Sequence, residues 1–395
     1  DVNNTLKSIK KLGVNLKKRK NYCEIEGVGL NGFNFKNNTE INCENSGTLA
    51  RLICGILAKT NKTVILKGDA SLSKRDFSRV IKPLNLLGVK IISNSKRLPL
   101  KIKGTNFLKP IEFEENIGSA QVKSCIMLAA LNTPGVTKIK AAKSRNHSEL
   151  MFKYLKIPIK INKSKNFDRI EIKGLTQYQS FNYNIPGDIS SSSPFICLAA
   201  LSKNSKILIK GVNVNPSRTG IIDILKKMNV KIIIKNKKKY NGEYVADLLV
   251  KSCKSLNAIK CEKKYNSRAI DEFPLIFLAC AKAKGISYFN NLSELRQKES
   301  DRLKITSNFL KMIGIKVEEK FDSLKIYGNP KLDLNKKFII KNYMKDHRVF
   351  MMACIAALTF GGKFEIHDKD SIKTSFPSFM KILKKIGAEI KWEKK

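Results

Sequence analysis

The hydrophobic residues of this 395-residue chain follow a pattern that recurs about every 70 residues. Each copy consists of an amphipathic helix pattern, a turn, and a short strand in which apolar residues alternate with Lys, as in Leu87–Ile91. Five of the six turn positions hold Gly or Asn, which tolerate the left-handed backbone that ends a helix, whereas Pro158 requires a different turn. The six turns fall at positions 13, 88, 158, 229, 314 and 387.

A second helix pattern in most copies is apolar on every face. A helix that is hydrophobic all round is buried, so each copy is expected to supply one buried and one amphipathic helix. Because the copies are longer than ordinary solenoid repeats, we expect small subdomains with their own sheets, grouped as two domains of three in an α+β (α/β) fold. The expected buried helices are Leu49–Leu57, Val122–Leu131, Pro194–Leu201, Phe273–Ala281 and Val349–Leu358.

Composition favours a globular protein in a reducing compartment. Apolar residues make up 42% of the chain, and the longest apolar run, Val349–Phe360, is too short for the ~20 residues that a membrane span needs. The nine Cys are scattered singly, which argues against a disulfide framework or a zinc site. Five of them lie in apolar helical runs and are expected in the core: Cys54, Cys125, Cys197, Cys280 and Cys354.

The net charge of +43 raises the alternative of a nucleic-acid-binding protein. Lys is spread along the whole chain, however, and neither grouped basic residues with aromatics nor a known nucleic-acid motif is present. The inflated Lys, Asn and Ile content is typical of a drift toward A/T-rich codons. We therefore expect no nucleic-acid partner, although the positive field should attract small anionic substrates.

Polar clusters stand directly before the expected buried helices. A helix start offers unpaired N–H groups and a positive dipole end, which suit an anion, although each cluster alone is more simply an N-cap. Five clusters in register favour a common site if the copies pack symmetrically. They are Glu44–Thr48, Gly118–Lys123, Pro186–Ser192, Arg268–Glu272 and Lys345–Arg348.

Arginine is rare in this Lys-rich chain, and it is concentrated at these clusters. Arg grips phosphate or carboxylate with a planar fork that Lys lacks, so its placement predicts a cavity for such groups. The segment Glu294–Arg302 adds three acids among three cations, which makes it a candidate for proton transfer beside a bound anion. Structural ion pairs remain the alternative for Arg79, Arg218 and Arg268. The nine arginines in or beside the clusters are Arg51, Arg75, Arg79, Arg145, Arg218, Arg268, Arg296, Arg302 and Arg348.

Ten spaced motifs, in this order, resemble the enolpyruvyl transferases, and most closely the EPSP synthase branch of that family. The resemblance extends along the whole chain. The motifs are Asn45–Arg51, Ser71–Arg79, Ser119–Ser124, Ser144–His147, Pro186–Asp188, Asn215–Gly220, Asp271–Glu272, Lys298–Arg302, Asp346–Arg348 and Lys373–Pro377.

The resemblance implies two domains, residues 1–185 and 186–395, each of three βαβαββ-like subdomains. It implies transfer of the enolpyruvyl group of phosphoenolpyruvate to the 5-hydroxyl of shikimate 3-phosphate, by addition and then elimination of phosphate. The implied partners are these two small anions, with no metal or organic cofactor. A cytoplasmic monomer without membrane or nucleic-acid partners is expected.

The resemblance also assigns site residues, which we expect in one cleft between the two domains. Asp271 would hold the 5-hydroxyl and act as the base, and Glu299 would donate the proton to the methylene carbon. Shikimate 3-phosphate would be held by Ser119, Ala120, Gln121, Ser144, Arg145, Asp271 and Lys298. Phosphoenolpyruvate would be held by Gly47, Arg75, Gln121, Arg302, Arg348 and Lys373.

Some positions depart from the family pattern. The family carries an N-terminal strand and a Lys-Ser-x-x-x-Arg loop, and this motif does not occur in the sequence. We therefore expect the chain as given to be truncated at its N-terminus and poorly active. Asp76 replaces a usual Pro, and Glu294 stands where many relatives have Asn.

Several alternatives stay open. A transferase that acts on UDP-N-acetylglucosamine has the same fold, but that branch places a Cys in the loop before Arg75, and Gly68–Lys74 has none. The other two alternatives are an RNA-end-processing cyclase and a non-catalytic basic binding protein. His347 is a secondary catalytic candidate, Glu272 is assigned to capping its helix, and no pattern suggests metal ligation by His147 or His367.

Overall fold

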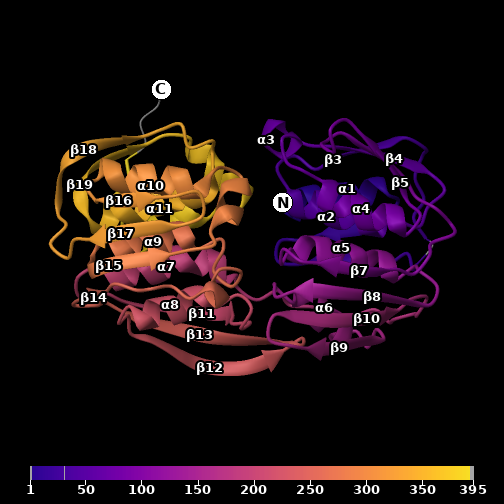
Figure 1. Ribbon diagram of the computed structural model, residues 1–395, viewed down its shortest axis with the longest axis horizontal. Coiled ribbons are helices and arrows are strands. Elements are labelled where there is room, and N and C mark those ends of the chain that lie inside the picture. Colours follow the sequence, from indigo (N-terminus) through magenta and orange to yellow (C-terminus); the bar gives the residue numbers. More distant parts are fainter. Residues whose placement is uncertain (1, 31, 392–395) are drawn as a thin grey trace. The chain divides into compact units, whose positions relative to one another are not determined.

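The computed structural model describes residues 2–30 and 32–391. The chain divides into two compact units, one running up to Asn184 and the other from Ile185 onward (Figure 1). Each unit has a hydrophobic core of its own.

The first unit interleaves helices and short strands. Its elements are α1 (Val2–Lys11), β1 (Leu16–Lys18), β2 (Cys23–Ile25), β3 (Thr39–Asn42), α2 (Gly47–Ile56), β4 (Thr63–Lys67), α3 (Ala70–Ser73), α4 (Ser78–Leu86), β5 (Lys90–Ser93), β6 (Leu100–Lys103), β7 (Glu112–Glu115), α5 (Ala120–Ala130), β8 (Val136–Ala142), α6 (His147–Tyr154), β9 (Ile159–Lys163) and β10 (Phe167–Lys173).

The second unit follows the same alternation and adds three 3-10 helices. Its elements are α7 (Ile189–Leu201), β11 (Lys206–Asn213), α8 (Gly220–Lys227), β12 (Ile232–Tyr240), β13 (Glu243–Lys251), β14 (Leu256–Asn257), η1 (Lys263–Tyr265), α9 (Phe273–Ala281), β15 (Ala283–Phe289), η2 (Ser293–Gln297), α10 (Arg302–Met312), β16 (Val317–Glu319), β17 (Leu324–Gly328), β18 (Leu334–Ile340), α11 (His347–Thr359), β19 (Gly361–Ile366), η3 (Lys369–Thr374) and α12 (Phe379–Lys385).

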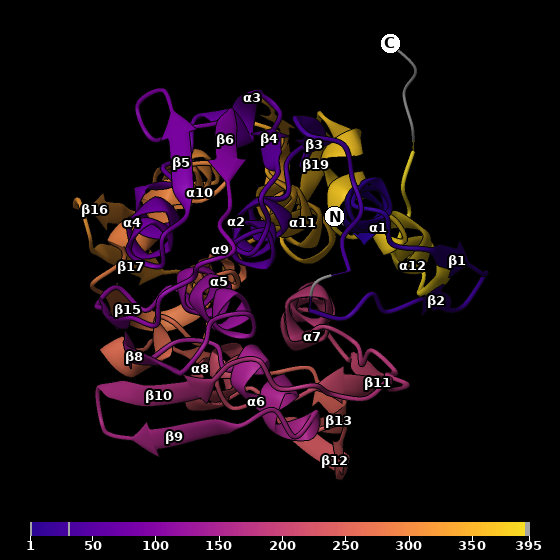
Figure 2. The same ribbon diagram turned by 90° about the vertical axis from the view of Figure 1, so that its right-hand side faces the viewer.

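Three four-stranded sheets share one strand order, namely β3-β4-β6-β5, β7-β8-β10-β9 and β14-β15-β17-β16. In each sheet the first two strands are parallel and flank a buried helix in sequence, and the other pairs are antiparallel. Figure 2 shows one of these sheets, with α6 beside β9 and β10. This βαβαββ arrangement, with its interleaved helices and sheets, confirms the predicted fold class.

The remaining sheets are shorter versions of the same unit. The sheet β11-β13-β12 lacks the first strand, and a single parallel bridge from Gly187 to Val212 takes its place. The parallel pair β18-β19 and the antiparallel pair β1-β2 complete the set.

The five predicted buried helices are confirmed as α2, α5, α7, α9 and α11. All nine residues of α9 are buried, as expected for a helix that is apolar on every face. In the first unit α2 packs on α5, and in the second unit α7, α9 and α11 contact one another. All five helical Cys predicted for the core are buried there, and all nine Cys are free thiols.

Five of the six predicted turns hold a residue with positive φ, namely Gly13, Gly88, Asn229, Gly314 and Gly387. The next residue of each turn donates its N–H to a carbonyl five positions back, as Val14 does to Ile9 at 3.2 Å. The placement of the remaining turn at Pro158 was wrong. Lys156, at φ +57°, occupies the turn, and the N–H of Ile157 bonds the Phe152 carbonyl at 2.9 Å.

We predict that Lys156→Gly stabilises the fold. A left-handed side-chain-bearing residue costs about 1–2 kcal/mol, and glycine recovers part of this after its larger loss of backbone entropy. The free energy of unfolding in urea should rise by about 0.5–1 kcal/mol. The control Lys153→Gly, inside α6, should lower it by about 1 kcal/mol. Equal losses in both variants would contradict the assigned turn.

Candidate active site

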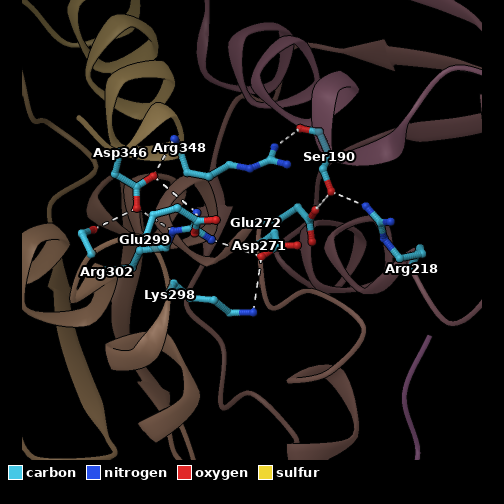
Figure 3. A network of polar contacts seen from close by, with 10 residues as sticks. Ser190, Arg218, Asp271, Glu272, Lys298, Glu299, Arg302, Asp346 and Arg348 are labelled. Carbon is cyan, nitrogen blue, oxygen red and sulfur yellow. Dashed lines mark hydrogen bonds and ion pairs between the residues drawn. The ribbon is translucent and has the colours of Figure 1, made fainter. Parts of the chain in front are cut away.

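The polar centre of the second unit is built around the side chain of Arg302, which is 1% exposed (Figure 3). Its Nε, Nη1 and Nη2 atoms lie 2.9 Å from Asp346, 3.1 Å from Asp271 and 2.5 Å from Glu299. A buried guanidinium is tolerated only when it is paired and hydrogen-bonded, and here three carboxylates share that task. One cation therefore fixes both residues predicted to be catalytic.

The charges around Arg302 hold it in the protonated form. Burial acts to lower the pKa of Arg302, but the carboxylates of Asp346, Glu299 and Asp271 raise it above its usual value. Lys298 adds a second cation, with its Nζ 3.6 Å from Asp271 Oδ1. The Asp271 and Glu299 side chains stay 17% and 25% exposed, so a small molecule can reach them.

Asp346 connects this centre to the start of α11. It is fully buried and accepts hydrogen bonds from Ser300 Oγ at 2.9 Å and from the Arg348 N–H at 2.8 Å. The second bond makes Asp346 the N-cap of α11. The same carboxylate therefore orients Arg302 and begins the helix that carries Arg348.

The starts of α7, α9 and α11 meet at Ser190. Its hydroxyl donates to the carboxylate of Glu272 and lies 2.5 Å from Arg218 Nη2, and its carbonyl accepts from Arg348 Nη1 at 2.8 Å. Pro194 explains why that carbonyl is available. Proline has no N–H, so the helical bond that residue 194 would make to the Ser190 carbonyl does not form.

The structure corrects the role expected for Glu272. Its side chain makes no capping bond to α9 and is 1% exposed, with the Ser190 hydroxyl as a partner. The sequence showed that an acid precedes α9, but it could not show that α7 passes close enough to bury it.

Other arginines serve as structural ion pairs, as expected for two of them. Arg218 lies 3.0 Å from Asp188, and Arg268 lies 2.6 Å from Asp223. Arg296 also forms structural ion pairs. Its guanidinium donates hydrogen bonds to the carboxylates of Asp301 and Glu319 and to the carbonyls of Lys320 and Phe321.

A second polar centre lies in the first unit, where α2 and α5 begin. Arg51 donates from Nη1 to Gln121 Oε1 at 3.0 Å, and Gln121 donates to Thr48 Oγ1 at 2.9 Å. A Cβ atom on Gly47 would stand 2.8 Å from Nη1 of both Arg51 and Arg75. Glycine therefore leaves room for both guanidinium groups beside the start of α2.

The first turn of α5 carries the predicted residues Ala120 and Gln121, and Ser119 caps it by accepting from the Val122 N–H at 3.3 Å. The Arg145 carbonyl accepts from Lys123 of the same helix. Ser144 Oγ is buried and has no hydrogen-bond partner among residues 2–30 and 32–391.

The predicted residues thus form two groups. The second unit brings together Asp271, Lys298, Glu299, Arg302 and Arg348, and the first unit brings Gly47, Arg75 and Gln121 together beside Ser119 and Ala120. Lys373 stands apart: its side chain is 70% exposed and pairs with Asp370 on η3. Sequence reasoning gave no role to Asp346 or Ser190, although both lie inside motifs it had marked.

Sequence comparisons identify the family. The family profile of EPSP synthase (3-phosphoshikimate 1-carboxyvinyltransferase) matches residues 1–383. This chain belongs to the EPSP synthase family. It is 41% identical to the 3-phosphoshikimate 1-carboxyvinyltransferase of Ruthia magnifica subsp. Calyptogena magnifica, with 99% of this chain and 88% of the relative covered. It is 42% identical, at the same coverage, to the enzyme of that name from Vesicomyosocius okutanii subsp. Calyptogena okutanii.

Solved structures show the same fold. An EPSP synthase from Acinetobacter baumannii aligns with a TM-score of 0.83 and 33% identity, covering 97% of this chain and 86% of that chain. The enolpyruvyl transferase NikO from Streptomyces tendae aligns with a TM-score of 0.70 at 13% identity over 98% of this chain and 86% of that one, which shows a shared fold alone. In the described part of the chain, no helix combines the length and apolar character that a bilayer crossing requires.

His347 is the first residue of α11, and the charges of this centre act on it. Burial, and next the charge of Arg348, lower the pKa of His347 to about 4, while Asp346 opposes the shift. Arg302 and Glu299 act on it in opposite directions. The imidazole is therefore neutral at pH 7.

This shift predicts a loss of stability in mild acid. An unfolded His binds a proton near pH 6.5, whereas the folded chain resists protonation until about pH 4, so unfolding is favoured as pH falls through this window. His347→Gln should remove up to about 3 kcal/mol of that pH dependence of the unfolding free energy. His367→Gln, a control one residue beyond β19, should keep that pH dependence. If the unfolding free energy of His347→Gln falls with pH as steeply as that of the wild type, the assignment of this pH dependence to His347 is refuted.

Proposed function

We propose that this chain transfers the enolpyruvyl group of phosphoenolpyruvate to the 5-hydroxyl of shikimate 3-phosphate and releases phosphate. The observation that carries the proposal is the pairing of Asp271 and Glu299 on one buried guanidinium, that of Arg302. The reaction needs a base and an acid held in fixed positions beside cations, and this centre offers both.

The proposed addition step moves two protons. Asp271 removes the proton of the 5-hydroxyl, whose oxygen bonds to the central carbon of phosphoenolpyruvate. Glu299 gives a proton to the methylene carbon, which becomes a methyl group. In the elimination step a methyl proton is removed, the double bond re-forms and phosphate leaves. Glu299 must carry a proton to act first as the acid, and the negative charge of two bound substrates favours that form.

The cations of both units have a common electrostatic role in this proposal. Each substrate carries phosphate or carboxylate groups, which Arg and Lys bind with charge-assisted hydrogen bonds. We assign Lys298 with Ser119, Ala120, Gln121, Ser144 and Arg145 to shikimate 3-phosphate, together with Asp271. We assign Gly47, Arg75, Gln121, Arg302, Arg348 and Lys373 to phosphoenolpyruvate. Arg302 is already paired with three carboxylates, and Lys373 is paired with Asp370, so each would share its donors between these partners and the ligand.

We also propose that the chain works as a cytoplasmic monomer without a nucleic-acid partner. Nine free thiols support a reducing compartment. Lys is spread along the sequence, without the grouped basic segments that nucleic-acid binders usually carry.

Titration against three ligands tests the function. Calorimetry should show saturable binding of shikimate 3-phosphate, and phosphate release should require both it and phosphoenolpyruvate. UDP-N-acetylglucosamine and a short single-stranded RNA should compete poorly. Tight, salt-sensitive binding of the RNA alone would reject the proposal, and so would turnover with UDP-N-acetylglucosamine in place of shikimate 3-phosphate.

Removal of either proton-transferring group should reduce turnover. Asp271→Asn and Glu299→Gln keep the side-chain size, and each should lower kcat about 100-fold or more while the circular dichroism spectrum is unchanged. Glu319→Gln is the control, because Glu319 pairs with Arg296 outside the Arg302 centre. Wild-type rates in both test variants would remove the assigned roles.

A further inference from the structure

An ion pair without an assigned role is enclosed in the first unit. Lys123 of α5 and Glu149 of α6 have side chains that are 1% and 3% exposed, and their Nζ and Oε1 atoms lie 2.5 Å apart. The Lys123 amine also donates to the Arg145 carbonyl at 2.9 Å. The ammonium group of Lys123 therefore binds both the loop before α6 and the first turn of that helix.

The position of Lys123 is otherwise a core position. Its neighbours Val122, Cys125 and Ile126 are buried and belong to the hydrophobic core of the unit. A well-packed apolar pair would fill this space at least as favourably as an ion pair, because burying two charges is costly. Its burial is therefore weak evidence that the pair stabilises the fold.

Two further contacts bind the same segments. Ser124 Oγ and Ser148 Oγ lie 2.6 Å apart, one residue beyond Lys123 and one before Glu149. Gly118 runs so close to the chain at Lys143 that a Cβ atom would stand 2.9 Å from the Lys143 carbonyl oxygen. Contacts at several points therefore hold the start of α5 against the segment around Ser144.

These two segments carry five residues assigned above to shikimate 3-phosphate, and Gln121 among them is also assigned to phosphoenolpyruvate. Ser119, Ala120 and Gln121 lie within the turn that precedes Lys123, and Ser144 and Arg145 lie in the loop that its amine holds. A displacement of about 1 Å in groups that position a substrate can cost as much as 100-fold in rate.

We propose that Lys123 and Glu149 are positioning residues that hold the Ser144–Arg145 loop against the start of α5 and so set the affinity for the phosphorylated acceptor. The inference rests on the proposed function, since it concerns the same binding site. It assigns no contact between either residue and the ligand.

The double variant Lys123→Met/Glu149→Leu tests this role. Replacing both charges leaves no unpaired buried ion, so the variant should fold with a melting temperature near that of the wild type. Its Kd for shikimate 3-phosphate, measured by calorimetry, should rise about 10- to 100-fold. The KM for shikimate 3-phosphate should rise likewise, while kcat at saturation with both substrates stays within about twofold.

The matched control is Lys140→Gln/Glu114→Gln, which removes an exposed ion pair between β7 and β8 of the same unit. It should leave the Kd unchanged. If the Lys123→Met/Glu149→Leu protein does not fold, Lys123→Met/Glu149→Gln, which also leaves no unpaired buried ion, supplies the same measurement, with a rise of at least threefold expected.

A wild-type Kd in a folded test variant would overturn the positioning role, and so would equal changes in test and control variants. A lower melting temperature with an unchanged Kd would show a structural role alone. Failure of the wild-type chain to bind shikimate 3-phosphate would instead reject the proposed function.

Discussion

The second unit depends on one buried cation. Arg302 is the first residue of α10. Its Nε, Nη1 and Nη2 atoms bind the carboxylates of Asp346, Asp271 and Glu299, which come from three separate parts of the chain. Without this guanidinium, three acids would face one another in a poorly hydrated space, and their repulsion would separate the segments that bear them. The same interaction that fixes the fold here also sets the separation of the two groups proposed to transfer protons.

Helix starts supply the rest of the polar chemistry in both units. A buried helix that begins at one end of a βαβαββ unit presents its first N–H groups and its N-cap there. Because the unit is repeated along the chain, several such helix starts occur. Pro194 adds a local device, because the missing N–H leaves the Ser190 carbonyl as an acceptor for Arg348. Gly47 adds another by leaving space for two guanidinium groups.

Sequence could predict what depends on local pattern. The apolar faces of α9 and α11 and the glycine turns were evident from spacing, and the motifs pointed to Asp271, Glu299 and Arg302 as neighbours of a common centre. The turn at Lys156 was not evident, because a lysine carries no preference for left-handed backbone and tertiary packing imposes it. The burial of Glu272 and the pairing of Lys123 with Glu149 were hidden too, since each depends on a helix from another part of the chain. How Lys373 would reach a ligand is likewise not encoded in its local sequence, because its present partner is the exposed Asp370.

The central claim is that the acids organised by Arg302 act on shikimate 3-phosphate. A crystal structure of this chain with that ligand bound measures this most directly. The account predicts that the 5-hydroxyl oxygen lies within about 3.2 Å of an Asp271 carboxylate oxygen, while the same ligand molecule contacts Gln121 or Arg145. A bound ligand whose 5-hydroxyl faces away from Asp271, with more than one water between them, would contradict it.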